Sequence, residues 1–247
     1  MARYDFATHR LFVPGIYAKG AKLPLAREAM NYLLNVLRMG EGARLLVFNG
    51  EAGEWLGTLE QPTRKTAVVA LDEQTRPQHA PGRIGYAFAP LKAARLDYMV
   101  QKAVEMGAAR LTPVLTQRTQ VSRLKEERIG ANAIEAAEQC GVLALPEVKP
   151  EVKLSAYLAA LPPGTLLVFA DEDAEVKNPV EALKQAKAEG EIEVLVGPEG
   201  GFTSDERALI LKHPNICRLS LGPRILRADT AAVAALTLVQ ATLGDLG

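Results

Sequence analysis

Two glycine-containing loops near the end of the chain carry the residues best suited to binding a ligand. The first has the sequence VLVGPEGGFTSDE and begins at Val194, so an apolar segment leads directly into three glycines. Glycine lets main-chain N–H and C=O groups come close to a ligand. Thr203, followed three residues later by Glu206, predicts a capping box. The pattern therefore predicts a strand, a ligand loop and a helix, in that order.

The second loop has the sequence LSLGPRILRADTA and begins at Leu219, where another apolar segment leads into a glycine turn. Asp229 or Thr230 is predicted to cap the alanine-rich helix that follows. Arg224 and Arg227 bring two planar cations to the same loop, and guanidinium groups suit anionic partners. Two loops of this kind in succession indicate one shared pocket.

Several common chemistries do not fit these loops. A phosphate-binding P-loop would place a Lys-Ser or Lys-Thr pair after its last glycine, and Phe202-Thr203 stands there instead. The glycine spacing also differs from the dinucleotide-binding fingerprint. The three histidines are scattered, and Cys140 and Cys217 stand alone among apolar neighbours, as buried thiols do. We therefore expect no metal site.

The two loops together resemble the signature of the SPOUT-class methyltransferases, and specifically the RsmE family, which methylates N3 of a uridine in 16S ribosomal RNA. The similarity spans nearly the whole chain. The segments that carry it are RLFV at 10–13, VLRM at 36–39, Lys92, QKA at 101–103, Glu105, Gly107, QRT at 117–119, AEQ at 137–139, GPEGGF at 197–202, LGPRILR at 221–227 and Thr230-Ala231. The chain departs from the family pattern at Asn31, Val142 and Asp229.

The resemblance implies transfer of a methyl group from S-adenosylmethionine to N3 of one uridine, conventionally numbered 1498, in the small ribosomal subunit. Uracil N3 carries a proton and lies on the pairing edge, so the base must be unpaired and its imide deprotonated or stabilised as an anion. An arginine can stabilise the uracil anion, and a carboxylate can accept the N3 proton. Arg118, Arg227 and Asp229 are the catalytic candidates, and their individual roles stay open.

The resemblance also implies which residues bind the cofactor and the RNA, together with a homodimer and a deep trefoil knot. Backbone groups and apolar side chains of both glycine loops suit an adenosine with an amino-acid tail. The residues expected to bind the cofactor are Leu195, Gly197, Pro198, Glu199, Gly200, Leu219, Leu221, Gly222, Ile225, Leu226 and Ala231. Those expected to bind RNA are Arg10, Arg38, Lys92, Glu138 and Gln139.

The surrounding sequence predicts two domains that would position these residues. Short apolar segments and a turn over 49–53 predict a β-rich unit over 1–75, with one helix at 25–38; the resemblance makes it a PUA-like RNA-binding β-barrel. A polar, proline-bearing segment at 74–82 predicts the linker. From there to residue 247, apolar strands alternate with helical patterns, which predicts an α/β domain with a parallel sheet, the SPOUT methyltransferase domain. The strands expected in the first unit are 10–13, 43–49, 54–59 and 67–71, and those in the second are 84–91, 111–115, 166–170, 193–196 and 218–221, with a helix at 94–106.

Composition limits the class of protein further. The 247 residues are 48% hydrophobic, with 29 basic and 29 acidic side chains. The balance argues against loose nucleic-acid binding, but basic residues gather in the first forty positions, as a local RNA surface would require. No apolar run is long enough to span a membrane and the start carries no signal region, so we expect a cytoplasmic protein without a membrane partner.

Two other classes of function stay open on the sequence alone. One is an RNA-binding module whose transferase domain has lost activity; it would bind cofactor weakly and leave RNA unmodified. The other is a small-molecule nucleotide enzyme that uses the same glycine loops, and it would have no affinity for RNA.

Overall fold

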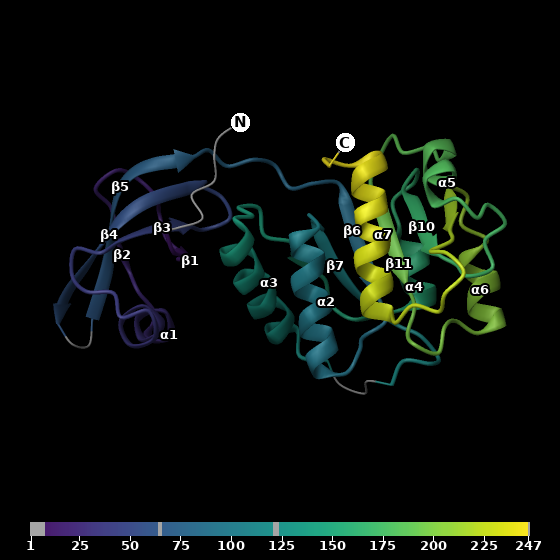
Figure 1. Ribbon diagram of the computed structural model, residues 1–247, viewed down its shortest axis with the longest axis horizontal. Helices are drawn as coiled ribbons and strands as arrows, with labels where there is room; N and C mark the ends of the chain where they lie inside the picture. The colour runs from purple at the N-terminus through teal and green to yellow at the C-terminus, as the bar shows by residue number, and fades with distance from the viewer. Residues whose placement is uncertain (1–7, 64–65, 121–123, 247) are drawn as a thin grey trace. The chain divides into compact units, whose positions relative to one another are not determined.

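The computed structural model describes residues 8–63, 66–120 and 124–246 of the chain, shown in Figure 1. Close contacts divide the chain into two compact units. The first comprises Met1–Ala80 together with Ala137–Leu145, and the second comprises Pro81–Ala136 and Pro146–Gly247. The first unit therefore includes a short segment from the middle of the chain, which the sequence pattern did not indicate. A domain boundary between residues 75 and 76 stays a prediction.

The first unit is built on a five-stranded sheet in the order β1-β3-β4-β5-β2. Its pairs are antiparallel except for β1 with β3, which run parallel. The alternating burial of β5 places one face of this strand on a core with Leu45, Leu59 and Val69, against which Trp55 packs. The strands are β1 (Arg10–Phe12), β2 (Lys22–Pro24), β3 (Arg44–Phe48), β4 (Glu54–Thr63) and β5 (Thr66–Arg76).

The predicted linker at 74–82 begins too early. Residues 74–76, the first three of that range, form the end of β5, which runs to Arg76. Gln74 pairs with Trp55, and Arg76 pairs with Glu54 across the sheet. The Thr75 hydroxyl also donates to a Glu54 carboxylate oxygen over 2.9 Å. Polar residues can therefore extend the strand, since a buried carboxylate on the neighbouring strand accepts their hydrogen bonds.

The predicted helix at 25–38 forms as two shorter pieces, α1 (Arg27–Asn31) and the π-type turn η1 (Tyr32–Val36). The helical turn closes at Arg38, whose φ is +55°. The Met39 N–H then bonds back to the Leu33 carbonyl over 2.9 Å, one residue further back than in a Schellman motif, as expected after a π-type turn. Arg38 thus occupies the left-handed position that a glycine usually takes.

The second unit contains a parallel sheet in the order β12-β10-β11-β6-β7-β8, with the short β9 also paired to β7. All the pairings between these strands run parallel, which confirms the predicted α/β class with a parallel sheet. The strands are β6 (Ile84–Phe88), β7 (Arg110–Leu115), β8 (Glu147–Val148), β9 (Val152–Lys153), β10 (Leu166–Ala170), β11 (Ile192–Val196) and β12 (Ile216–Leu219). The helices are α2 (Ala93–Glu105), α3 (Glu126–Cys140), α4 (Leu154–Ala160), α5 (Pro179–Gln185), α6 (Ser204–Ile210) and α7 (Ala228–Leu243); the last four residues of α3 belong to the first unit.

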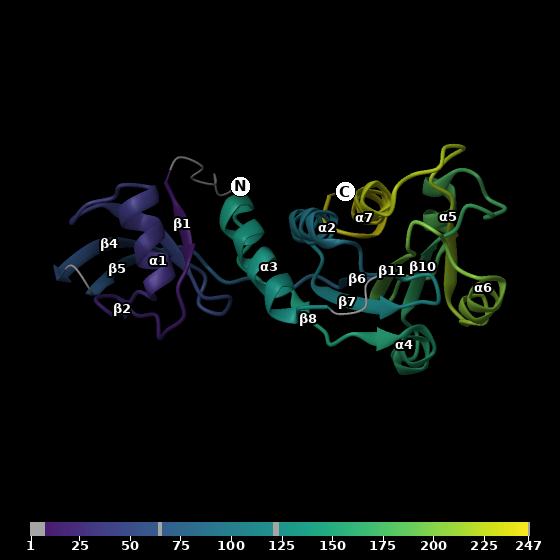
Figure 2. The ribbon, with the colours of Figure 1, turned by 90° about the horizontal axis from the view of Figure 1, so that it is seen from below.

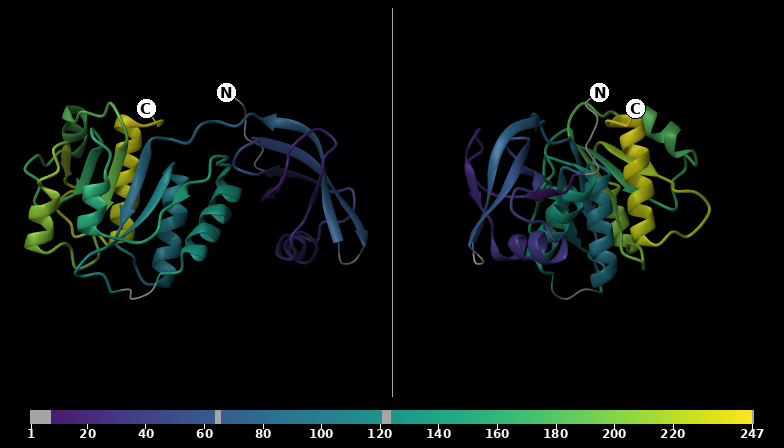
Figure 3. Two further views of the ribbon diagram at one scale, coloured as in Figure 1. Left: turned by 180° about the vertical axis from the view of Figure 1, so that it is seen from behind. Right: turned by 60° about the vertical axis from the view of Figure 1, so that its left-hand side comes forward.

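Helices cover both faces of this sheet. Figure 2 shows α2 and α7 side by side on one face, with α4 on the other, and Figure 3 shows the sheet from behind with α7 on its far side. All five residues of β6 and of β11 are buried, as expected of central strands covered on both faces. Strand order reverses between β6 and β11. Because β10 runs parallel to both β11 and β12, the carboxyl ends of these three strands lie at one edge of the sheet.

None of the helices in the described residues is long and apolar enough to cross a bilayer. Cys140 and Cys217 are free thiols, half-buried and buried respectively. Burial raises the pKa of the Cys217 thiol to about 11, so this side chain is protonated and poorly nucleophilic at neutral pH.

Candidate functional site

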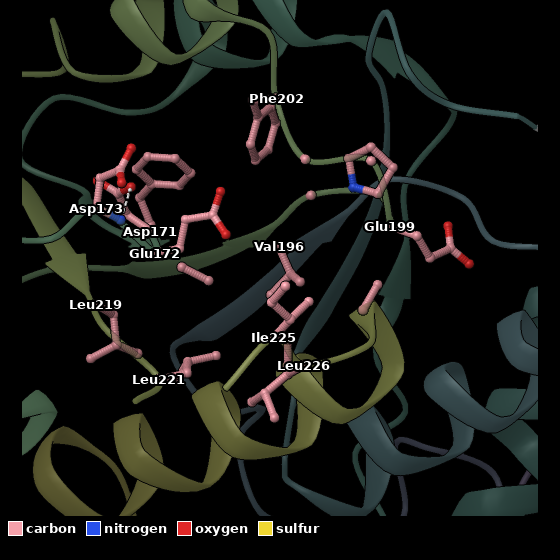
Figure 4. A pocket seen from close by; sticks show the side chains of 18 of the residues that line it. Asp171, Glu172, Asp173, Val196, Glu199, Phe202, Leu219, Leu221, Ile225 and Leu226 are labelled. Atoms are coloured by element: carbon pink, nitrogen blue, oxygen red, sulfur yellow. Dashed lines mark hydrogen bonds between the residues drawn. The ribbon is translucent and has the colours of Figure 1, made fainter. Parts of the chain in front are cut away.

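A cavity of about 330 Å³ opens at the shared edge of the sheet, where β10, β11 and β12 end. Ligands of open α/β sheets bind in the crevice beyond the carboxyl ends of the strands. Figure 4 shows the side chains of most of the residues that line it. The lining residues are Phe169, Ala170, Asp171, Glu172, Asp173, Val196, Gly197, Pro198, Glu199, Gly200, Gly201, Phe202, Arg207, Leu219, Leu221, Gly222, Arg224, Ile225, Leu226, Ala228 and Ala231. Both predicted loops therefore line one cavity, with a third wall from the segment after β10.

The first loop is shaped by contacts around Phe202. A Cβ on Gly197 would lie 2.6 Å from the Phe202 ring, so only glycine lets the ring lie against the loop. The ring meets Phe169 edge to face, with centroids 5.4 Å apart. The predicted capping box is confirmed, because the Thr203 side chain accepts from the Glu206 N–H and the Glu206 side chain accepts from the Thr203 N–H. The loop is thus held at its end by α6.

The second loop lies in front of α7 and presents an apolar face to the cavity. Gly222 turns the chain at φ +94°, which an L side chain rarely adopts. Ile225 is 96% exposed at the cavity edge, whereas Leu226 is half-buried in its lining. The helix α7 begins after Arg227, which accepts from the Ala231 N–H through its main-chain carbonyl and has an exposed side chain. The predicted cap at Asp229 or Thr230 is wrong, because both residues lie inside the first turn of α7 and no side chain forms a cap bond there.

The third wall is an acidic turn after β10, and its carboxylate Asp171 is only 4% exposed. Arg218 donates to it over 2.7 Å and Arg207 over 3.0 Å. Burial alone would raise the pKa of Asp171, but the two arginines outweigh it and the pKa lies below its usual value. In Figure 4 the neighbouring Glu172 carboxylate points into the space bounded by Phe202 and Val196.

This acidic wall was not predicted from the sequence. The segment was predicted only as a strand ending at Ala170, although carboxylates directly after a buried parallel strand are placed at the sheet edge where ligands bind. Arg207, which also lines the cavity, was missed as well. The position of Asp171, Glu172 and Asp173 directly after a predicted strand could have indicated the site. The same three residues are equally typical of a solvent-exposed turn.

The structure brings most of the predicted cofactor residues together. Every one of them lines the cavity except Leu195, which is fully buried in the core of the second unit with Ala87 and Phe169. Successive residues of a strand face opposite sides, and the next residue, Val196, lines the cavity instead.

None of the three catalytic candidates is among the residues that line the cavity, and they occupy two places next to lining residues. Arg118 follows β7, and its Nη1 donates to the Gly200 carbonyl at the cavity wall. Asp229 lies in the first turn of α7, where a carboxylate oxygen accepts from the Thr230 N–H over 2.9 Å. Arg227 is directly before this turn. Asp229 also acts on Tyr86 of β6, whose pKa is well above its usual value, first because the hydroxyl is buried and second because of the negative charge of Asp229.

The predicted RNA residues differ in accessibility. In the first unit Arg10 is buried and forms a 2.6 Å ion pair with Glu54, which is itself 2% exposed. A Glu138 carboxylate oxygen accepts from the Phe12 N–H over 2.8 Å. Both residues thus hold the first unit together, and this placement favours a structural role over direct RNA contact. Arg38 and Gln139 are exposed.

Lys92 is exposed at the position that precedes α2 in the second unit. One helical turn later, Arg95 forms a 2.9 Å ion pair with Glu199, a residue of the first glycine loop. Figure 4 shows the Glu199 side chain pointing away from the cavity. Arg95, which the sequence analysis did not single out, therefore ties this loop to α2.

The geometry is that of an α/β domain that binds a small ligand between two glycine loops and an acidic turn. Comparison with known proteins places it in a family. The profile of the RNA methyltransferase domain matches residues 78–240, and that of the RNA methyltransferase PUA domain matches residues 25–72.

Individual relatives agree along almost the whole chain. The ribosomal RNA small subunit methyltransferase E of Rickettsia conorii is 30% identical over 233 residues, which cover 94% of this chain and 95% of the relative. The enzyme of that name from Neisseria gonorrhoeae, solved bound to S-adenosylmethionine, is 27% identical with a TM-score of 0.82, covering 97% of this chain and 100% of that one. A Legionella pneumophila protein solved with bound S-adenosylmethionine is 31% identical with a TM-score of 0.82, covering 95% and 97%.

The chain therefore belongs to the ribosomal RNA small subunit methyltransferase E family. This confirms the resemblance that the glycine loops carried.

Proposed function

We propose that this protein transfers the methyl group of S-adenosylmethionine to N3 of one uridine in the 16S RNA of the small ribosomal subunit, and does so in the cytoplasm. The single observation that carries the proposal is the cavity, which both family glycine loops line. The solved relatives with bound S-adenosylmethionine support the same donor.

The cavity and its lining residues fit S-adenosylmethionine. The cavity volume of about 330 Å³ lies in the range of small-molecule sites. Leu219, Leu221 and Leu226 offer apolar walls to an adenine ring, and the glycine loops offer main-chain donors and acceptors. The Glu172 carboxylate suits the ribose hydroxyls or the ammonium group of the amino-acid tail. When bound, S-adenosylmethionine supplies the methyl group.

The chain's own residues then orient the acceptor and handle its proton. Arg118 and Arg227 supply positive charge beside the cavity, where it would stabilise the uracil anion that forms on loss of the N3 proton. Asp229 is the one carboxylate in the sequence of residues 219–231 and is assigned the proton. Residues 1–75 dock the RNA in this proposal, and residues 76–247 carry out the transfer.

A homodimer and a trefoil knot belong to the same proposal. The family resemblance implies both, and the composition of α7 supports the dimer. After Asp229 this helix carries no charged side chain, and Val233, Ala234 and Leu238 remain partly exposed on it. An uncharged helix face with partly exposed apolar side chains suits a contact with another protein surface. Sedimentation of the purified protein tests whether a second copy covers it.

The reaction itself is tested with labelled S-adenosylmethionine and unmethylated small ribosomal subunits. After incubation, the RNA is digested and the modified nucleoside is identified by mass spectrometry. We expect the label in 3-methyluridine at one site. Cofactor binding without transfer would point to an inactive RNA-binding protein, and transfer only to a free nucleotide would point to a small-molecule enzyme; either result contradicts the proposal.

Arg38 provides a test of RNA docking that separates binding from stability. Its left-handed backbone costs about 1 kcal/mol relative to glycine. We therefore expect Arg38→Gly to raise the free energy of unfolding by roughly that amount, while it weakens binding to 16S RNA because an exposed cation is lost.

Chemical denaturation and RNA titration at two salt concentrations measure the two effects. Arg38→Asn is the matched control, since asparagine tolerates the left-handed conformation and also lacks the charge. It should weaken RNA binding as much as Arg38→Gly and stabilise the protein less. Unchanged RNA affinity in both variants would remove Arg38 from the docking surface.

A further inference from the structure

Glu206 is a buried carboxylate whose two oxygens bond to separate parts of the site. It lies in the first turn of α6 and is 8% exposed. One oxygen accepts from the Thr203 N–H over 2.9 Å and from the Thr203 hydroxyl over 3.2 Å. The other accepts from the Gln117 N–H over 2.7 Å. The capping box explains the first set of bonds but not the bond to Gln117, which is 89 residues away in the sequence.

The bond to Gln117 fixes the turn that carries Arg118. Thr116 and Thr119 close this turn, because the Thr119 N–H donates to the Thr116 carbonyl over 3.2 Å and the Thr116 N–H donates to the Thr119 hydroxyl over 3.0 Å. Glu206 holds the turn from the side of α6. The backbone of Arg118 therefore has attachments on both sides.

The side chain of Arg118 then lies across the first glycine loop. Its Nη1 donates to the Gly200 carbonyl. A Cβ on Gly200 would lie 3.3 Å from the Arg118 Cδ, so the loop and the arginine side chain are in close contact. The guanidinium reaches the cavity wall only while the turn and the glycine loop keep their spacing, and Glu206 bonds to both.

We propose that Glu206 is a positioning residue for methyl transfer, which acts by holding Arg118 against the cofactor loop. The inference rests on the proposed function and on the role of Arg118 in it. The function requires an ionised carboxylate, because both oxygens accept hydrogen bonds from N–H groups. A glutamine would offer one acceptor and turn an NH₂ group toward the other donor.

Glu206→Gln tests the inference by single-turnover methylation of small subunits and by S-adenosylmethionine titration. We expect the rate to fall about 10- to 100-fold, as misplacement of a charged group by a fraction of an ångström can do. The dissociation constant for S-adenosylmethionine should change much less. Asn178→Ala is the matched control, because it removes the side-chain oxygen that caps α5, a helix that does not line the cavity, and leaves both sets of Glu206 bonds intact. It should lower thermal stability and leave the single-turnover rate near the wild-type value.

A double-mutant cycle with Arg118→Ala decides whether Glu206 acts through Arg118. We expect Arg118→Ala with Glu206→Gln to be no slower than Arg118→Ala alone, since the second change has nothing left to misplace. If the two losses multiply, the inference is overturned although the proposed function stands. If Arg118→Ala has the wild-type rate, the proposed role of Arg118 fails, and a wild-type protein that does not methylate small subunits refutes the proposed function itself.

Thr119→Val provides a second route should Glu206→Gln fail to fold. It loosens the same turn by removing the hydroxyl that accepts from Thr116, and it leaves α6 untouched. We expect a similar loss of rate that also disappears in the Arg118→Ala background. A wild-type rate for folded Thr119→Val would contradict the positioning of Arg118 by this turn.

Discussion

Arg227→Ala is expected to lower the single-turnover rate of methyl transfer by about 10²- to 10³-fold, the range seen when one group that stabilises a developing anion is removed. The free energy of unfolding should change by less than about 0.5 kcal/mol, as for surface substitutions in general. The reason is that the Arg227 side chain is exposed, has no hydrogen-bond or ion-pair partner among the described residues and makes no cap bond to α7. The bond from the Ala231 N–H to the Arg227 carbonyl, 2.8 Å long, involves only the main chain and does not depend on this side chain.

Rapid-quench methylation and chemical denaturation measure these two quantities. Lys212→Ala, which removes an exposed cation after α6, controls for a general loss of charge and should leave the rate unchanged. Arg224→Ala tests whether any cation in the second loop has the same effect. A rate loss matched by an equal loss of stability would make Arg227 a structural residue.

Asp171→Ala should have the largest effect on stability. Removing one partner of a buried ion pair lowers the free energy of unfolding by about 3 to 5 kcal/mol, and we expect a loss at the lower end of this range. The change leaves Arg207 and Arg218 without their shared buried carboxylate. The lower end applies because these arginine side chains are 29% and 24% exposed and can partly rehydrate. Affinity for S-adenosylmethionine should also fall, because Asp171 holds the acidic turn that lines the cavity.

The pH dependence of stability checks the same residue. The pKa of Asp171 is lowered in the folded protein, so the ionised carboxylate stabilises the fold above the ordinary pKa of about 3.9. This contribution is lost as the pH falls through that value toward the lowered one. The difference in unfolding free energy between wild type and Asp171→Ala should therefore be constant near neutral pH and shrink below about pH 4. Asp173→Ala, whose side chain is 72% exposed, should have little effect at any pH.

The ligand loops could be predicted from the sequence because their determinants are local. Apolar strand residues, glycines and a cap residue lie within a dozen positions of each other, as the loop ending at Glu206 illustrates. Five strands of the parallel sheet were predicted for the same reason, although β6 ends at Phe88 rather than Leu91 and β12 spans Ile216–Leu219 rather than 218–221. The two-residue strands β8 and β9 were not predicted, because segments this short show no periodicity.

The remaining features depend on partners far apart in the sequence. Arg10 was predicted at an RNA surface, but its ion-pair partner Glu54 is 44 residues away, and no local pattern shows that both are buried. Asp171 likewise has its arginine partners 36 and 47 residues away. A single sequence shows that such charges exist, and only the fold shows which of them neutralise each other.

The return of residues 137–145 to the first unit has a consequence for synthesis of the protein. The Arg10 guanidinium donates to the Glu138 carbonyl, and the Arg76 guanidinium donates to the Gly141 carbonyl over 3.0 Å. These bonds cannot form while only the first eighty residues have left a translating ribosome. The five strands of the amino-terminal sheet therefore emerge first, and the first unit reaches its final set of contacts only after more than half of the polypeptide has been made.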